Sequence, residues 1–117
     1  MERRKNTIVL VSPDARLGHR RKQLLESEGL PVVVIRRPDE LAPACRKHRP
    51  RLIMIGRSAD PAQRRQAWAA AREACESPIV ELTHNDIPEP AQTSFFLDPD
   101  PPCEFVRRVK QILKVRS

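Results

Sequence analysis

The most restrictive feature of the sequence is the apolar run Leu52–Ile55, which follows Pro50 and ends at Gly56. A short run without polar alternation is typical of a strand that is buried on both faces. Such strands lie in the middle of parallel sheets, and ligand or catalytic groups gather just beyond their carboxyl ends. The residue at that point is a glycine, which has no side chain to supply chemistry. The sequence therefore predicts a central strand whose end lacks a reactive group.

Four further apolar runs predict the other strands, and a helical pattern follows each of the first three and the last one. The predicted strands are residues 7–11, 32–35, 52–55, 79–82 and 95–97. The predicted helices are residues 15–28, 40–48 and 61–76, with a last helix that begins at Pro101; the expected N-caps are Asp14, Asp39, Asp60 and Asp100. We expect Gly29 to end the first helix, whose apolar stripe is interrupted by Arg21. The last helix has a clear apolar stripe that consists of Phe105, Val106, Val109, Ile112 and Leu113. Strands that alternate with helices in this way predict an α/β domain with a doubly wound parallel sheet.

One connection breaks this pattern. Residues 83–94 contain Pro88 and Pro90 and show no apolar periodicity, so we expect a loop with at most one helical turn there. No linker or repeat divides the rest of the chain. We therefore expect one domain over residues 7–117, preceded by a basic extension over residues 1–6.

Composition excludes several classes of protein. No run of eighteen apolar residues is present, which argues against a transmembrane helix, and the N-terminal run is too short for a signal peptide, so we expect a cytoplasmic protein. The three cysteines, Cys45, Cys75 and Cys103, are odd in number and lack CxxC spacing. This pattern argues against a disulfide framework and a zinc site, and it favours reduced cysteines that serve in packing.

The net charge of +7 and the pI near 10.2 make nucleic acid or another anion a candidate partner. The basic residues are scattered, however, over different predicted elements, and no aromatic residue interrupts their clusters to stack on bases. Nucleic-acid binding therefore remains an alternative that the sequence does not favour. Glu81 lies within an otherwise apolar strand, and we expect its carboxylate either to snorkel to the surface or to be ion-paired, with a nearby arginine as a candidate partner.

The order and spacing of these segments resemble the receiver domain of bacterial response regulators in two-component systems. The resemblance covers residues 6–116 and rests on five stretches: Ile8–Val11, Leu24–Leu30, Arg49–Ile55, Ser77–Thr83 and Phe96–Pro99. It implies a flavodoxin-like fold with five parallel strands in the order 2-1-3-4-5. Against that pattern, the loop at residues 83–94 implies that the family's fourth helix is short or missing.

The family's phosphoryl chemistry uses five groups, and this sequence resembles the family at only one of them. An aspartate after the third strand accepts the phosphoryl group from a histidine kinase, an acidic pair after the first strand holds Mg²⁺, and a Thr or Ser and a Lys bind phosphoryl oxygens. The acceptor position falls on Gly56. The acidic pair falls on Ser12 and Pro13, with Asp14 one residue later, the lysine position falls on Asp98, and only Thr83 is retained.

The resemblance thus implies a degenerate receiver, or pseudo-receiver. We expect a non-enzymatic signalling or protein-interaction module that works without phosphorylation, cofactor or metal, with a protein partner or a second copy of itself. The expected surfaces are the 83–96 loop and the edge of the last helix, including Phe95, Phe96, Phe105 and Arg108. Two alternatives remain: a basic module that binds nucleic acid or an anionic ligand, and a small-molecule or metal site around Asp14, Gly56 and Asp98.

Overall fold

The computed structural model describes residues 7–56, 61–74, 76–82, 95–97 and 102–116. The strands are β1 (Ile8–Val11), β2 (Val32–Ile35), β3 (Leu52–Ile55), β4 (Ile79–Leu82) and β5 (Phe95–Leu97). The helices are α1 (Ala15–Glu26), α2 (Leu41–His48), α3 (Pro61–Ala74) and α4 (Pro102–Arg116), with a 3-10 turn, η1 (Pro38–Glu40), before α2.

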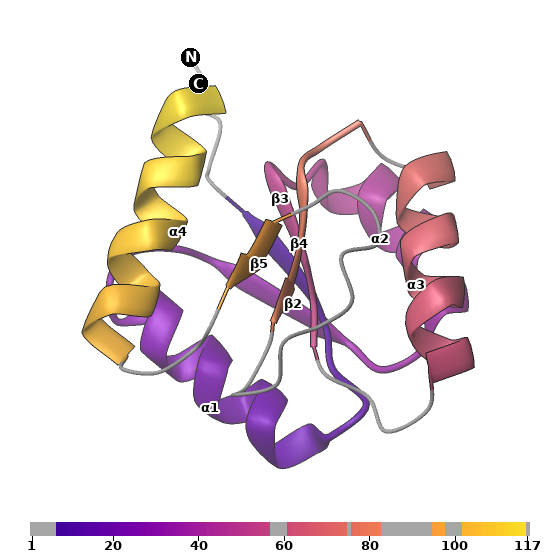
Figure 1. Ribbon diagram of the computed structural model, residues 1–117, viewed down its shortest axis with the longest axis horizontal. Coiled ribbons are helices and arrows are strands. Elements are labelled where there is room, and N and C mark those ends of the chain that lie inside the picture. The colour runs from indigo at the N-terminus through magenta and orange to yellow at the C-terminus, as the bar shows by residue number, and fades with distance from the viewer. Residues whose placement is uncertain (1–6, 57–60, 75, 83–94, 98–101, 117) are drawn as a thin grey trace.

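All five strands are parallel and stand in the order β2-β1-β3-β4-β5. β1 is flanked by β2 and β3, so that Ile8 lies opposite both Val32 and Leu52. The helices α1 and α4 cover one face of the sheet, and α2 and α3 cover the other (Figure 1). The predicted flavodoxin-like α/β fold and its strand order are confirmed. The predicted shortening of the fourth helix falls in residues 83–94, outside the described residues.

Each central strand contributes alternate residues to two separate cores, because successive side chains of a strand point to opposite faces. Leu10 joins Leu25 and Phe105 beneath α1 and α4. Val9 joins Leu41 beneath α2 and α3. Since both faces are covered, β1 and β3 are buried along their whole length, as the unbroken apolar runs predicted.

The burial of Phe105 corrects one prediction about the surface. Phe105 is 0% exposed and belongs to the core, so it is not part of an interaction surface. The apolar stripe of α4 faces the sheet, and an aromatic residue on that stripe stabilises the fold. Arg108 lies on the exposed side of the same helix. Its proposed role stays a prediction, as do those of Phe95 and Phe96, whose side chains lie outside the described part of the chain.

The helix ends follow the expected local chemistry with small shifts. The carboxylate of Asp14 caps α1 by accepting hydrogen bonds from the backbone N–H groups of Arg16 (2.9 Å) and Leu17 (3.1 Å). Gly29, which was expected to stop this helix, adopts φ 83°, although the helix ends at Glu26, two residues earlier than predicted. α3 also ends two residues early, at Ala74, and α4 spans Pro102–Arg116, whereas its predicted first residue, Pro101, lies outside the described residues.

The cap of α2 differs from the prediction. The 3-10 turn η1 takes up Asp39 and Glu40, so that α2 begins at Leu41. The Glu40 carboxylate accepts hydrogen bonds from the backbone N–H groups of Arg36 (2.9 Å) and Arg37 (3.0 Å). These two hydrogen bonds to the ionised form hold the pKa of Glu40 below its ordinary value of 4.5.

Cys45 corrects the expectation of three reduced cysteines. It is buried in α2 and is disulfide-bonded, with a partner outside the described side chains. An odd number of cysteines argues against a framework of several bridges, but it does not exclude a single one. In the part of the chain that the structure describes, no helix is both long and apolar enough to cross a membrane.

Candidate functional site

The carboxyl ends of β1, β2 and β3 form the edge at which the sequence placed the degenerate site. The backbone N–H of Gly56 donates to the carbonyl oxygen of Val11 at 2.7 Å, and that of Ser12 donates to the carbonyl oxygen of Ile35 at 2.8 Å. The hydrogen bonding between the three strands thus continues for one residue beyond the ends of β1 and β3. This tight edge positions every described residue of the candidate site.

Gly56 is closed in by backbone. A Cβ atom added there would lie 2.9 Å from the carbonyl oxygen of Val11, closer than side-chain carbons approach such an atom in proteins. Because the obstructing atom belongs to the main chain of β1, no change of rotamer can relieve the contact. An aspartate could enter at this position only if the two strand ends moved apart. The sequence has no side chain at position 56, where the resemblance places the phosphoryl acceptor. The structure adds that a main-chain oxygen of β1 obstructs the space in which such a side chain would begin.

A cation from α1 lies beside the same position. The Nη1 atom of Arg21 is 3.7 Å from the point that a Cβ atom on Gly56 would occupy. Arg21 is half-buried, and it interrupts the apolar stripe that was predicted for this helix. α1 approaches the edge closely because Gly18 is buried against Ser12: a Cβ on Gly18 would lie only 3.0 Å from the Ser12 hydroxyl. A fixed guanidinium therefore lies beside the site in which receivers of the family pattern hold Mg²⁺.

The three predicted residues that follow β1 all have structural roles. Ser12 is 2% exposed, and its hydroxyl donates a hydrogen bond of 2.8 Å to the carbonyl oxygen of Asp14. The carboxylate of Asp14 is the N-cap of α1, and Pro13 lines a pocket at the edge. No cluster of three or more His, Cys, Asp or Glu suited to a metal ion occurs among the described residues. Thr83 and Asp98 lie outside the described residues.

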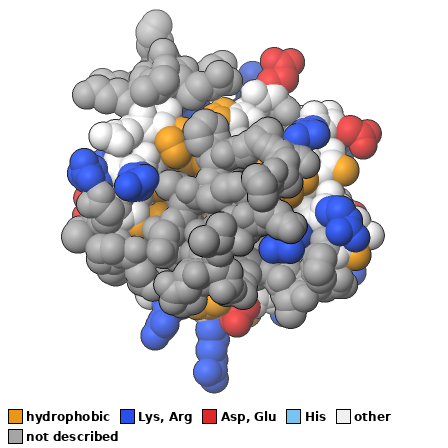
Figure 2. Space-filling view, in the orientation of Figure 1, with side chains coloured by type: hydrophobic (Ala, Val, Ile, Leu, Met, Phe, Trp, Pro, Cys, Tyr) orange, Lys and Arg blue, Asp and Glu red, His pale blue; other side chains and the backbone are white. Residues whose placement is uncertain are grey.

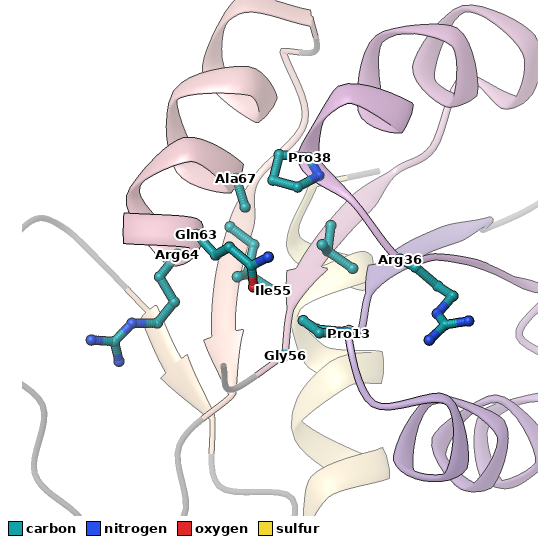
Figure 3. Close-up of a pocket in the computed structure, with 9 residues that line it drawn as sticks. Pro13, Arg36, Pro38, Ile55, Gly56, Gln63, Arg64 and Ala67 are labelled. Carbon is teal, nitrogen blue, oxygen red and sulfur yellow. The ribbon is translucent and has the colours of Figure 1, made fainter. Parts of the chain in front are cut away.

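The pocket at this edge is mostly apolar. Its volume is about 240 Å³, part of it open solvent, and its lining residues are Val11, Pro13, Arg36, Pro38, Ile55, Gly56, Gln63, Arg64 and Ala67. Figure 3 shows the amide of Gln63 directed toward the floor near Ile55, whereas the side chains of Arg36 and Arg64 extend away on opposite sides. The two guanidinium groups do not converge, so the described pocket has no paired cationic clamp for an anion.

Arg64 instead pairs with the buried carboxylate of β4. Glu81 is 8% exposed, and its Oε2 atom lies 3.6 Å from Nη1 of Arg64. The indole Nε1–H of Trp68, also on α3, donates a hydrogen bond of 2.7 Å to Oε1. The guanidinium of Arg72 lies over the Trp68 ring, 5.7 Å from its centroid. The expected ion pair of Glu81 is confirmed. The tryptophan donor was missed, because contacts across strand and helix leave no local signal in the sequence.

The basic side chains do not gather into one field on the face shown in Figure 2. Lysine and arginine groups stand apart around the rim of this view, over the α4 side and over the α3 side, with others at the lower edge. On this face, the described residues therefore give no continuous positive track of the kind that a nucleic-acid backbone would follow.

Comparison with solved structures identifies the fold. The receiver domain of Klebsiella pneumoniae RstA, in its BeF3-activated form, matches with a TM-score of 0.77 and 23% identity, over 93% of this chain and 99% of that chain. The receiver domain of Francisella response regulator 1452 matches with a TM-score of 0.79 and 16% identity, over 97% and 100%. The anti-anti-sigma factor PhyR from Bartonella quintana matches with a TM-score of 0.72 and 21% identity, over 98% of this chain and 50% of that chain. No family model matches the sequence, and no curated protein matches it. The chain thus has the receiver fold.

Proposed function

We propose that this chain is a pseudo-receiver: a non-catalytic signalling module that acts through protein contacts and does not depend on aspartyl phosphorylation. The observation that carries the proposal is the closure of Gly56. A Cβ at that position would meet the main chain of β1 at 2.9 Å, so the acceptor is missing and cannot be replaced without backbone movement.

Two further features of the edge support this proposal. Arg21 places a guanidinium beside the position where the family pattern has an acceptor and a metal ion, and a fixed cation there opposes the entry of Mg²⁺. The carboxylate of Asp14, which lies one residue after the positions of the family's acidic pair, is engaged in capping α1. Both backbone hydrogen bonds are accepted by its Oδ1 atom, so a metal ion at that oxygen would have to compete with them.

The comparisons favour a role in signalling. Receiver domains of response regulators share the fold, and so does PhyR, an anti-anti-sigma factor. We accordingly propose a protein partner or a second copy of the chain as the binding partner, and a cytoplasmic location. Nucleic-acid binding and a small-molecule or metal site remain alternatives.

The proposal is tested with phosphoryl donors and a phosphoryl mimic. The chain is incubated with Mg²⁺ and acetyl phosphate and examined by intact-mass spectrometry. A parallel sample with beryllofluoride and Mg²⁺ is followed by amide ¹H–¹⁵N spectra. We expect no mass adduct and no amide shifts at the ends of β1 and β3.

The RstA receiver domain is the control in both measurements, because its structure was determined in the BeF3-activated form. A phosphoryl adduct on this chain would overturn the proposal. So would amide shifts with beryllofluoride that match those of the control in size and location.

A further inference from the structure

The carboxyl end of α2 and its connection to β3 carry a compact group of cations. We name Arg46, Lys47, Arg49 and Arg51 the basic patch. The first three side chains are exposed and the fourth is half-buried. The patch lies near the amino end of β3, and Gly56 lies at the opposite, carboxyl end of the same strand. Contacts there could therefore form whatever the state of the degenerate site.

The backbone beneath the patch is firmly held. The N–H of Arg49 donates to the carbonyl oxygen of Cys45 (3.0 Å), and that of Arg51 donates to the carbonyl oxygen of Thr7 (2.8 Å). Pro50, between them, is buried, and its carbonyl oxygen accepts a hydrogen bond from the Ser77 hydroxyl. The four cations therefore project from an ordered platform, which lowers the entropy lost when a partner binds.

None of the four cationic groups forms an ion pair or side-chain hydrogen bond among the described residues. Three cations elsewhere in the described part of the chain do have an acidic partner: Arg37 with Asp39, Arg64 with Glu81, and Lys110 with Glu28. The helix dipole gives a structural reason for Arg46 and Lys47, which stand in the last turn of α2. The helix dipole explains the charge of Arg51 less well, because that residue lies beyond the end of the helix.

Arg49 adds an independent observation. It has φ 46° and ψ 62°, in the left-handed region, and no other described residue except glycine has a positive φ. The chain uses glycine for this conformation after α1, where Gly29 has φ 83°. Stability alone favours glycine at position 49 as well. An arginine at a strained position with no internal partner in the described structure indicates that its side chain serves a contact outside this chain.

We propose that the basic patch is a docking surface for a short acidic segment, rich in Asp and Glu, of a protein partner. This inference rests on the proposed function and names the chemistry of the partner. Three of the four cations are arginines, whose planar guanidinium groups bind carboxylates through paired hydrogen bonds. Residues 46–51 include no Phe, Tyr or Trp to stack on exposed bases.

The border of the patch also favours a short acidic segment over a nucleic acid. α3 packs beside α2, and Glu73, in its last turn, is exposed. Glu76 lies beyond the helix, is also exposed, and precedes Ser77, which bonds to Pro50. A phosphate backbone that continued past the patch in this direction would meet these negative charges. A short peptide can bind the four cations without reaching them.

The test uses a fluorescein-labelled hexapeptide of alternating Asp and Glu, with binding followed by fluorescence anisotropy in 50 mM and 500 mM NaCl. The patch variant carries Arg46→Gln, Arg49→Gly and Arg51→Gln. The control variant removes three exposed arginines elsewhere, with the substitutions Arg16→Gln, Arg20→Gln and Arg65→Gln. The two variants have the same net charge, so any difference between them reports the location of the charges.

We expect the wild type to bind the peptide in 50 mM NaCl and to lose most of this binding in 500 mM. The patch variant should bind at least tenfold more weakly, and the control variant should stay within twofold of the wild type. Absence of wild-type binding in 50 mM NaCl, or equal losses in the two variants, would overturn the proposal. A random-sequence duplex DNA of twenty base pairs is titrated in parallel. Tighter binding of that duplex than of the peptide, with the same tenfold loss in the patch variant, would reassign the patch to nucleic acid.

Circular dichroism establishes whether both variants are folded. If the patch variant unfolds, Arg49→Gly alone replaces it, because that change relieves the strained backbone; a peptide affinity within 1.5-fold of the wild type would then contradict the proposal. The phosphoryl-donor experiment does not depend on the patch, so a failure of this docking proposal can be told apart from a failure of the proposed function.

Discussion

Replacing Gly56 with alanine tests whether the end of β3 is closed by the main chain of β1. The new methyl group would lie 2.9 Å from the carbonyl oxygen of Val11. That oxygen already accepts the hydrogen bond from the Gly56 N–H at 2.7 Å, so the two strand ends cannot separate without weakening this bond. The substitution adds a single carbon and no charge, and it therefore isolates the steric part of the argument.

The expected cost follows from the nature of this contact. Overpacking a filled site costs typically about 1–3 kcal/mol, and a main-chain obstacle belongs in the upper half of that range because it has no alternative rotamer. Alanine also lowers the entropy of the unfolded chain, which offsets up to about 1 kcal/mol. The net destabilisation is therefore about 1–2 kcal/mol. With about 2.1 cal/mol/K of unfolding entropy per residue, a chain of this length should lose roughly 4–8 °C in Tm.

Thermal and urea unfolding, each followed by circular dichroism, measure this loss. The matched control is Gly18→Ala, the same chemical change at a buried glycine whose nearest obstacle, at 3.0 Å, is the side chain of Ser12. Three side-chain atoms of Ser12 and Val34, at 3.0–3.2 Å, would each have to shift by a few tenths of an ångström. Alanine gains about 1 kcal/mol of helix propensity over glycine, which offsets the cost of these shifts, so we expect a change near zero. A Gly56→Ala variant as stable as the wild type would refute the closure of the β3 end and remove the main support for the proposed function.

Three other perturbations test separate parts of the structure. Trp68→Phe removes the hydrogen-bond donor to the buried Glu81 carboxylate. Because hydrogen bonds to charged groups are among the stronger ones, the free energy of unfolding measured with urea at pH 7 should fall by about 1.5–3 kcal/mol. An equal fall in a Glu81→Leu background, where no carboxylate is present, would contradict this. The pKa of Glu40 is lowered in the folded state, so this carboxylate stabilises the fold fully above its ordinary pKa of 4.5, and the stabilisation is lost as the pH falls through the folded-state pKa. The Tm difference between the wild type and Glu40→Gln should therefore shrink between pH 6 and pH 3. A Tm difference that stays constant over this range would refute the argument. Arg49→Gly should raise stability by about 1 kcal/mol, because glycine adopts positive φ without strain; a lower urea midpoint would show that the arginine supports the fold.

The elements of this fold could be predicted because their signals are local. Asp14 caps α1 and Gly29 follows it in the left-handed conformation, as the cap and stop residues indicated. The apolar runs placed all five strands, and the parallel sheet follows from the alternation of strands and helices. The wrong assignment of Phe105 shows the limit of this method. The apolar stripe of α4 was recognised, but one of its residues was assigned to the surface, whereas such a stripe faces the sheet.

The features on which the proposed function rests are distances between elements, and these have no local signal in the sequence. The Val11–Gly56 contact joins positions 45 residues apart, and Trp68 reaches Glu81 from a different element. In the sequence, Arg21 is recognisable only as a charge that interrupts the apolar stripe of the first helix. Its guanidinium reaches the end of β3 because Gly18 lets α1 lie close to Ser12, and this contact has no local signal. The disulfide of Cys45 likewise depends on which cysteines lie close together in space, and the number of cysteines does not predict this.

The degenerate edge shows why its chemistry would be hard to restore by a single substitution. The described residues at the edge have new structural tasks: the Ser12 hydroxyl bonds to the Asp14 carbonyl oxygen, the Asp14 carboxylate caps α1, and the Gly56 N–H bonds to Val11. An aspartate at position 56 would have to displace main chain and would then lie beside Arg21, which would hold its carboxylate in an ion pair. An acidic group in place of Ser12 would remove the hydroxyl that fastens the turn into α1. Each of these substitutions would therefore lower the stability of the fold without by itself restoring a phosphoryl or metal site. Because these costs must be met together, we expect no single substitution to restore phosphoryl chemistry at this edge, and the signalling role that we propose requires another surface.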